Sequence, residues 1–206
     1  RIVNTQEPSF VFFTDAHIGR ERNRSDIKRY DDNFFSFIKD GGYSVVISGG
    51  DMSDDGEMSE SLVAFLERIE ENTSLYLETK GNHDRHPYNY KAEDFFSFWS
   101  NTLFSAKTHL TYADLLEEKY GILSTGRYLI KTDKGDISIY VLDTSMRSFS
   151  SSQLKWLDEA LGEDDTKCRI LISHDNIITG GEMDQSLFLT GMGDEEEVAA
   201  FMEIVN

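Results

Sequence analysis

Hydrophobic and polar positions along the chain predict a repeated strand–helix order. Residues 9–14, 44–48 and 75–78 are short, mostly apolar runs, and such runs are typical of strands that are covered on both faces. Between them, apolar residues recur at helical spacing over residues 25–39 and 57–70. Strands and helices that alternate with short connections predict a parallel sheet with right-handed crossovers.

The ends of the first helix carry recognisable signals. Ser25 is its expected N-cap, because a serine side chain in that position can accept a backbone N–H. Gly41 and Gly42 should end the same helix, since glycine is the usual residue just beyond a helix C-terminus.

The second half of the chain has a different pattern, which predicts a second sheet or its edge. Two apolar segments flank Asp133-Lys134-Gly135, a turn sequence that favours an antiparallel hairpin. Ser151 or Ser152 is the expected cap of the next helix. The expected elements after residue 85 are helices over 92–99 and 112–120, hairpin strands over 126–132 and 136–142, a helix over 151–161, a buried strand over 168–173 and a helix over 194–205. No internal repeat or linker interrupts this order, so we expect residues 1–206 to form one domain.

The charge of the chain excludes some classes of partner. The 206 residues include 20 Lys and Arg against 38 Asp and Glu, a formal net charge of −18. Such a surface repels phosphate backbones and anionic membranes, so we expect no duplex nucleic acid as a partner. No stretch approaches the ~20 apolar residues of a membrane span. The charge could concentrate divalent cations, although a solvated acidic face is the simpler explanation.

Cys168 lies in an apolar segment, where a buried thiol is expected, and one cysteine makes no disulfide framework. The chain begins with Arg1 and shows no signal-peptide pattern. We therefore expect a soluble protein and leave its compartment open between the cytoplasm and export with a removed signal. The oligomeric state is equally open.

Polar side chains follow four of the predicted strands at the point where each strand ends. They are Asp15 and His17, Asp51, the run Asn82-His83-Asp84, and His174. Ligands of open α/β sheets bind at the carboxyl ends of the strands, so we expect these groups to meet at one edge. Carboxylate, amide and imidazole ligands together suit Mn, Fe or Zn. A shared carboxylate would fit two ions ~3.5–4 Å apart.

Each cluster alone is a weak signal, because turn and edge residues are often polar. Asp15 and His17 are expected to point the same way from an extended chain. Asp51 follows two glycines that permit a tight turn, and His83 could hold a proton that Asp84 orients. The agreement of four strand ends favours a metal site over unrelated turn residues.

Three motifs in this order resemble those of the calcineurin-like metallophosphoesterases. They are Asp15-Ala16-His17, Gly50-Asp51-Met52-Ser53-Asp54 and Gly81-Asn82-His83-Asp84. The segment Gln153-Leu-Lys-Trp156-Leu157 is similar to a helix of the purple-acid-phosphatase-like branch, and Ile170 to His174 is similar to a strand that carries a metal-binding histidine. The resemblance implies a four-layer α/β/β/α sandwich with two metal ions at the sheet edges.

The resemblance also implies a set of metal ligands. Asp15 and His17 would bind one ion, Asp51 would bridge both ions, and Asn82 and His174 would bind the second.

The same resemblance assigns roles to residues around these ligands. His83 would protonate the leaving oxygen, Asp84 would orient His83, and Asp54 would support the metal ligands from behind. Arg85 and His86 lie next to this motif and are candidates for contacts with the substrate. For Arg85, pairing with one of the many acids is the alternative, and His86 could be an ordinary loop residue.

The expected function is a metal-dependent phosphoesterase that hydrolyses a phosphomonoester or phosphodiester of a small molecule by attack of a metal-bridging hydroxide. The family usually completes its site with a later Gly-His-x-His motif, and no histidine follows His174 here. We expect that the C-terminal part with this motif is missing from the sequence. The alternative is a degenerate, non-catalytic member of the family that acts as a binding or scaffold module.

Overall fold

The computed structural model describes residues 2–4, 7–18, 24–53, 56, 59–85, 116, 121–146, 148–175 and 195–206. The described elements are β1 (Ile2–Asn4), β2 (Phe10–Phe13), α1 (Arg24–Gly41), β3 (Val45–Ser48), α2 (Glu60–Asn72), β4 (Leu75–Glu78), α3 (Asn82–Arg85), β5 (Gly126–Lys131), β6 (Ile137–Val141), α6 (Ser151–Gly162), β7 (Cys168–Ile172) and α7 (Glu195–Val205). The helices expected over 92–99 and 112–120 lie outside the described residues, except for Leu116, which is buried.

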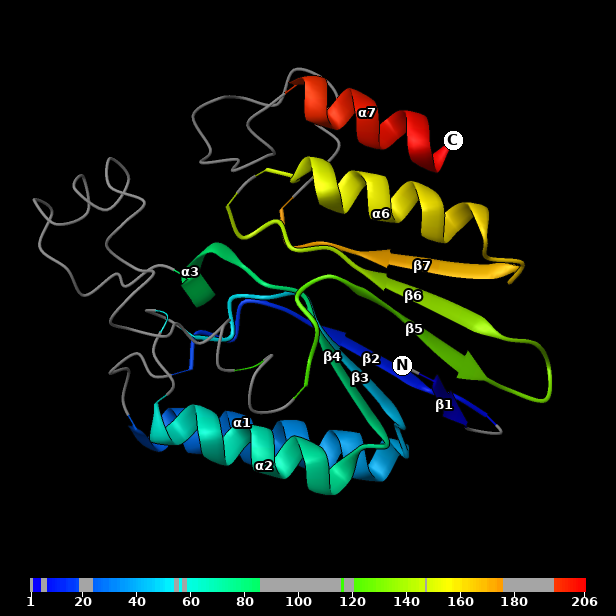
Figure 1. Ribbon diagram of the computed structural model, residues 1–206. Coiled ribbons are helices and arrows are strands. Elements are labelled where there is room, and N and C mark those ends of the chain that lie inside the picture. Colours follow the sequence, from blue (N-terminus) through cyan, green and yellow to red (C-terminus); the bar gives the residue numbers. More distant parts are fainter. Residues whose placement is uncertain are drawn as a thin grey trace, which may run out of the picture.

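The first sheet is parallel, with strand order β2-β3-β4. Phe13 is in register with Ser48, and Ser48 with Glu78, so the three strands end at the same level. The helices α1 and α2 form the crossovers, as the sequence predicts (Figure 1). The expectation that the first strand is buried on both faces is wrong, because β2 is an edge strand and the side chain of Phe12 is 59% exposed.

The helix ends differ slightly from the expected ones. The first helix begins at Arg24, so Ser25 lies in its first turn and is not the N-cap. Its C-terminus is as expected: Gly42 has a φ of +62°, and the backbone N–H of Tyr43 donates to the carbonyl of Ile38 at 3.2 Å. The second helix begins three residues late, where the Ser59 side chain accepts the backbone N–H of Leu62 at 3.2 Å.

The second sheet has strand order β1-β5-β6-β7. The predicted hairpin is confirmed, since β5 and β6 pair antiparallel, while β7 runs parallel to β6. Strand β1 pairs in parallel with β5 and was not expected from its sequence. The prediction of a buried Cys168 is wrong: β7 is an edge strand, and the thiol is exposed. Ser150, and not Ser151 or Ser152, caps α6 by accepting the N–H of Gln153 at 3.1 Å.

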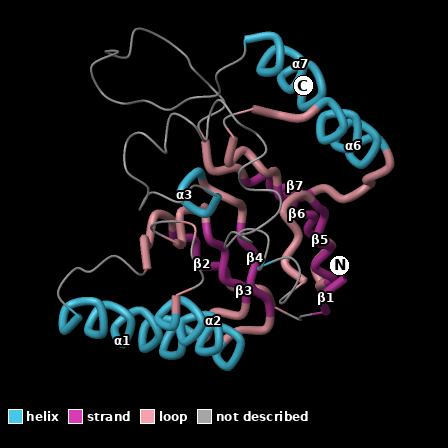
Figure 2. Tube along the Cα trace, turned by 60° about the vertical axis from the view of Figure 1, so that its left-hand side comes forward, coloured by secondary structure: helices cyan, strands magenta, loops and turns pink. Residues whose placement is uncertain are grey.

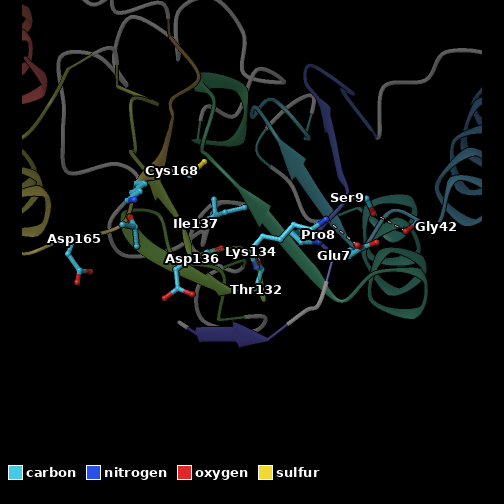
Figure 3. A pocket seen from close by; sticks show the side chains of 13 residues that line it. Glu7, Pro8, Ser9, Gly42, Thr132, Lys134, Asp136, Ile137, Asp165 and Cys168 are labelled. Atoms are coloured by element: carbon cyan, nitrogen blue, oxygen red, sulfur yellow. Dashed lines mark hydrogen bonds and ion pairs between the residues drawn. The ribbon is translucent and has the colours of Figure 1, made fainter.

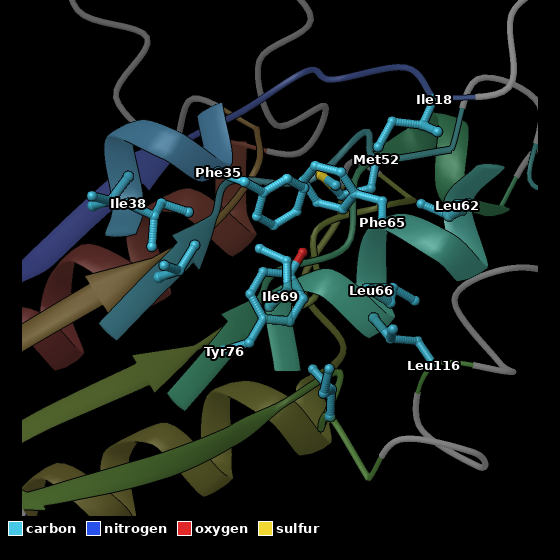
Figure 4. Packing of buried hydrophobic residues seen from close by; sticks show 13 residues of the cluster. Ile18, Phe35, Ile38, Met52, Leu62, Phe65, Leu66, Ile69, Tyr76 and Leu116 are labelled. Atoms are coloured by element: carbon cyan, nitrogen blue, oxygen red, sulfur yellow. The ribbon is translucent and has the colours of Figure 1, made fainter. Parts of the chain in front are cut away.

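Three hydrophobic cores separate four layers. One core joins α1 and α2 to the outer face of the first sheet, where Phe35, Phe65 and Ile69 pack with Tyr76 (Figure 4). A second lies between the two sheets, and a third lies under α6 and α7. The layers therefore follow the expected α/β/β/α order, which Figure 2 shows from the side. Each fully buried leucine or isoleucine contributes about 1.5–3 kcal/mol, so these cores hold the strand ends in fixed positions.

None of the helices in the described part of the chain is long and apolar enough to cross a membrane.

Candidate metal centre

The loops after β2 and β3 run side by side at the carboxyl edge of the first sheet. The backbone N–H groups of Asp15 and His17 donate to the carbonyl groups of Gly50 and Asp51, each at 3.0 Å. One step further, the N–H of Ile18 donates to a carbonyl of the same loop at 2.7 Å. These bonds extend the pairing of β2 and β3 beyond the strands. They bring the side chains of two separate motifs to one place.

The backbone of these loops is left-handed at three non-glycine positions. The φ angles of Asp15, His17 and Asp51 are 55°, 45° and 53°, and these are the non-glycine residues with positive φ in the described part of the chain. The expectation that Asp15 and His17 share an extended chain is therefore wrong. They still approach each other, with 3.8 Å between His17 Nε2 and Asp15 Oδ1. Residues held in such conformations are concentrated at functional sites.

Asp51 lies at the centre of the expected ligands. Its Oδ2 is 3.4 Å from His174 Nε2 and 4.0 Å from His17 Nε2. The ligand atoms of His17, Asp51 and His83 lie within 4.8 Å of one another, and so do those of Asp15, Asp51 and His174. Two clusters that share one carboxylate fit a pair of ions with Asp51 between them.

The resemblance implies that Asp15 and His17 bind one ion; these two groups lie 3.8 Å apart, and each also lies close to ligand atoms of other expected site residues. His83 stands with His17 in one cluster, and Asp15 stands with His174 in the other. The rings of His17 and His83 meet edge to face, with 4.5 Å between their centroids. Asn82 begins α3 beside His83 and is buried. This set of oxygen and nitrogen donors fits the divalent and trivalent metals that accept mixed ligands.

His174 is oriented by a backbone carbonyl, as is usual for metal-binding histidines. Its Nδ1 lies 2.8 Å from the carbonyl oxygen of Gly49, so Nδ1–H donates and Nε2 faces Asp51. Burial lowers the pKa of His174, but its hydrogen bond and charge interaction with Asp51 outweigh burial and raise that pKa to about 9. For Asp51, burial raises the pKa, but the contacts with His174 and His83 outweigh burial, so the pKa of Asp51 is lowered overall. The two side chains thus form an ion pair in the absence of a cation.

Two glycines let the three loops meet at Asp51. A Cβ on Gly81 would lie 2.5 Å from the backbone nitrogen of Asp51 and would overlap its carboxylate. A Cβ on Gly50 would lie 2.7 Å from the nitrogen of Gly81 and 2.9 Å from His174 Nδ1. Gly50 also has a φ of +97°, which favours glycine. The Asp51 carboxylate therefore has space because the residues at positions 50 and 81 are glycines, which have no Cβ.

Asp84 holds the loops after β3 and β4 together through hydrogen bonds. Its carboxylate accepts the backbone N–H groups of Asp51, Ser53 and Gly81, each at 2.9 Å. The side chain is fully buried. Burial, followed by the charge of Glu78, raises the pKa of Asp84 to about 8, against the opposing effect of the backbone N–H groups. The resemblance implied that Asp84 orients the His83 ring. The carboxylate oxygens of Asp84 instead accept backbone N–H groups of the loops after β3 and β4.

Arg85 is paired with an acid, which was the alternative to a contact with substrate. Its Nη2 lies 2.5 Å from Asp143 Oδ2, and its Nε donates to Ser145 Oγ at 2.6 Å. The Thr144 hydroxyl between them accepts the backbone N–H of His174 at 3.2 Å. Residues 143–145 were not predicted as part of the site, although a polar cluster directly after β6 is the same signal that marked the other strand ends. Asp54 and His86 lie outside the described residues.

A large cavity of about 1130 Å³ lies at the other end of the sheets (Figure 3). Its lining residues precede β2, β3 and β7, belong to the β5–β6 turn, or are the first residues of β6 and β7, so the cavity lies at the amino ends of β2, β3, β6 and β7. A pair between Lys134 Nζ and Glu7 Oε1, 3.3 Å apart, belongs to this cavity. None of the expected site residues lines it. The cavity is therefore separate from the metal centre.

Carboxylate and imidazole groups that could hold metal ions thus lie together at the strand ends of an α/β/β/α sandwich. The sequence family described as calcineurin-like phosphoesterase matches residues 8–198, and the chain belongs to this family.

One solved structure with a similar fold is the crystal structure of a dimetal phosphatase from Danio rerio. The two chains are 15% identical with a TM-score of 0.55, and the match covers 95% of this chain and 76% of that one. No curated protein sequence gives a significant match.

Proposed function

We propose that this chain is a phosphoesterase that uses two metal ions to hydrolyse a phosphomonoester or phosphodiester of a small molecule. The observation that carries this proposal is the position of Asp51, whose Oδ2 lies 3.4 Å from His174 Nε2 and 4.0 Å from His17 Nε2, between the two proposed sites. A carboxylate between two cation sites is what a two-metal centre requires. Membership of the calcineurin-like phosphoesterase family supports the same activity.

The residues that would hold the metals are Asp15, His17, Asp51, Asn82 and His174. When bound, two ions of Mn, Fe or Zn would lower the pKa of a water nucleophile and neutralise charge on the phosphoryl oxygens. The His174 ring is already aimed at Asp51 by the Gly49 carbonyl. Asp84 fixes the loops that carry Asp51 and Asn82.

His83 is the proposed proton donor to the leaving oxygen. Its backbone N–H donates to Asp51 Oδ1 at 2.8 Å, so its position is tied to that of the proposed bridging ligand. Its ring is partly exposed at the rim of the cluster. A histidine side chain in this position can act as a general acid toward a departing alkoxide.

A position in the purple-acid-phosphatase-like branch is a finer part of the proposal. The segment that suggests this branch lies in α6 and begins at Gln153. Gln153 is buried, and its Nε2 donates to the carbonyl of Asp143 at 3.3 Å and to Thr125 Oγ1 at 2.6 Å. Gln153 thereby ties α6 to the loop that supports His174.

The test is hydrolysis of 4-nitrophenyl phosphate by the full-length gene product, stripped of metal and then supplied with Mn, Fe or Zn. We expect activity that depends on added metal. The variant Asp51→Asn should lose at least about 100-fold in kcat/KM, because even the outer partners of metal ligands cost 10–100-fold. The exposed Asp133, in the β5–β6 turn, supplies the matched control Asp133→Asn, which should keep full activity.

The contrary result would be equal turnover by the wild type and Asp51→Asn. Binding of metal without turnover of any phosphate ester would favour the alternative, a non-catalytic binding or scaffold module.

A further inference from the structure

A second, smaller cavity opens directly beside the metal centre. It has a volume of about 300 Å³ and lies between the loop after β2 and the helices α1 and α2. Its walls are the aromatic side chains Phe13, Phe34 and Phe65, together with Asp31 and the loop residues Thr14, Ala16, His17 and Ile18. His17 is the key residue, because it lines this cavity and also belongs to a cluster of ligand atoms around Asp51. A group attached to a phosphate at the metals could therefore enter the cavity.

The aromatic walls are held in place from behind. Phe34 stacks on Phe65 with 5.8 Å between ring centroids, and Phe13 lies 4.9 Å from Phe34. Phe65 is buried and anchored in the core beside Met52 and Ile18 (Figure 4). Phe13 and Phe34 are only half-buried, so part of their apolar surface faces the cavity. Covering such surface is favourable for an apolar ligand.

The size and lining of the cavity match a ligand site. Binding pockets are mostly apolar, with a few polar groups that fix the orientation of the ligand. A cavity of about 150 Å³ is enough to bind benzene, so this one can hold an aromatic ring with its substituents.

Asp31 is the one acidic side chain in the described lining. It is half-buried beside the aromatic rings, and burial raises its pKa. Two other charged groups lie nearby: Arg68 opposes this shift, while Asp32 adds to it. Arg68 makes its ion pair with Asp32, at 3.1 Å. A carboxylate in this place disfavours a second negative charge on the group that enters the cavity.

We propose that this cavity binds the organic group of the substrate, and that the preferred substrates are phosphate esters of aromatic or bulky apolar alcohols without a second anionic group. The proposal rests on the phosphoesterase function proposed above. Phe13, Phe34 and Phe65 contact the apolar group, while Asp31 selects against an anionic one. Small and strongly polar esters leave the cavity empty and gain nothing from it.

The main test compares two substrates in two phenylalanine variants. The ratio of kcat/KM for 2-naphthyl phosphate to that for methyl phosphate should fall at least about tenfold in Phe34→Ala, as expected when a pocket loses apolar contact. Phe37 lies on the same helix and is 53% exposed, and it does not line the cavity. Phe37→Ala is therefore the matched control and should keep the wild-type ratio. The ratio removes any difference between the two esters that does not depend on the cavity.

Two further measurements keep the proposal testable if Phe34→Ala is unstable. Asp31→Asn should raise kcat/KM for 4-carboxyphenyl phosphate relative to 4-methylphenyl phosphate by at least about fivefold, since it removes a like charge. Calorimetric titration of the metal-free wild type with 2-naphthol, which carries no phosphate, should show binding that Phe37→Ala retains.

The outcomes separate this proposal from the proposed function. Metal-dependent hydrolysis whose substrate ratios are the same in the wild type, Phe34→Ala and Asp31→Asn would overturn the cavity proposal and leave the phosphoesterase intact. Absence of hydrolysis of every ester by the metal-loaded wild type would overturn the phosphoesterase function itself.

Discussion

His174 faces Asp51 across the metal centre, with Nε2 of the imidazole 3.4 Å from Oδ2 of the carboxylate. The opposite ring nitrogen is fixed by the Gly49 carbonyl at 2.8 Å. The two side chains come from different sheets, since Asp51 follows β3 and His174 follows β7. The pair therefore joins the two halves of the sandwich at the site where a cation would bind.

This pair should make the stability of the metal-free protein depend on pH. The pKa of His174 is raised from 6.5 to about 9 in the folded state, so its contribution is fully present below pH 6.5 and is lost as pH rises through 9. We expect the free energy of unfolding to fall by roughly 2–3 kcal/mol over this range. Urea unfolding at several pH values measures it. His174→Gln should lack this fall, and an identical pH profile in both proteins would contradict the ion pair.

The same proton should compete with a metal. An imidazole must be neutral to bind a cation, so the apparent affinity of the site that uses His174 should weaken by about tenfold for each pH unit below 9. Calorimetric metal titrations in buffers of different ionisation enthalpy count the protons released. The wild type should release one more proton than His174→Gln at neutral pH. Equal proton release would show that His174 does not bind the metal.

Removal of the Asp84 carboxylate should destabilise the loops after β3 and β4, which carry Asp51 and Asn82. An asparagine in this position turns an N–H₂ group toward backbone donors, and a buried donor left without an acceptor costs about 1–3 kcal/mol. We expect Asp84→Asn to lower the free energy of unfolding by about 2–4 kcal/mol and metal affinity by about 10–100-fold. Denaturant unfolding and metal titration measure the two effects, with Asp133→Asn as the exposed control. Wild-type affinity in Asp84→Asn would show that the loops need no such anchor.

Gly81→Ala should damage the centre through its shape alone. The added Cβ would overlap the carboxylate of Asp51, so this side chain must move. We expect metal affinity to fall at least about tenfold, with a smaller effect on thermal unfolding. The control is Gly162→Ala at the end of α6, where a Cβ would meet no atom within 4 Å. Unchanged metal binding by Gly81→Ala would argue against Asp51 as a ligand.

The sequence predicted the strands and their order along the chain because each strand forms its own short apolar run. It could not predict that Phe12 and Cys168 are exposed, since their burial depends on which strands lie at the sheet edges. Strand β1 has only three residues and gave no pattern of its own. The exposure of Phe12 and Cys168 and the pairing of β1 depend on segments that are distant in the sequence.

The candidate site shows the same division between local and distant causes. The positions of Asp15, Asp51 and His174 at strand ends were visible in the sequence, because short polar clusters followed apolar runs. The left-handed backbone of Asp15 and His17 was not, because it depends on hydrogen bonds to the loop after β3. Nor was the anchoring position of Asp84, whose three partners come from two separate loops.

The most direct test of the central claim is a count of metal ions bound to the full-length protein. Elemental analysis after loading with Mn, Fe or Zn and dialysis should give two ions per chain for the wild type and fewer than one for Asp51→Asn, since the shared carboxylate belongs to both sites. Two ions retained by Asp51→Asn, or none bound by the wild type, would contradict a two-metal centre built around Asp51.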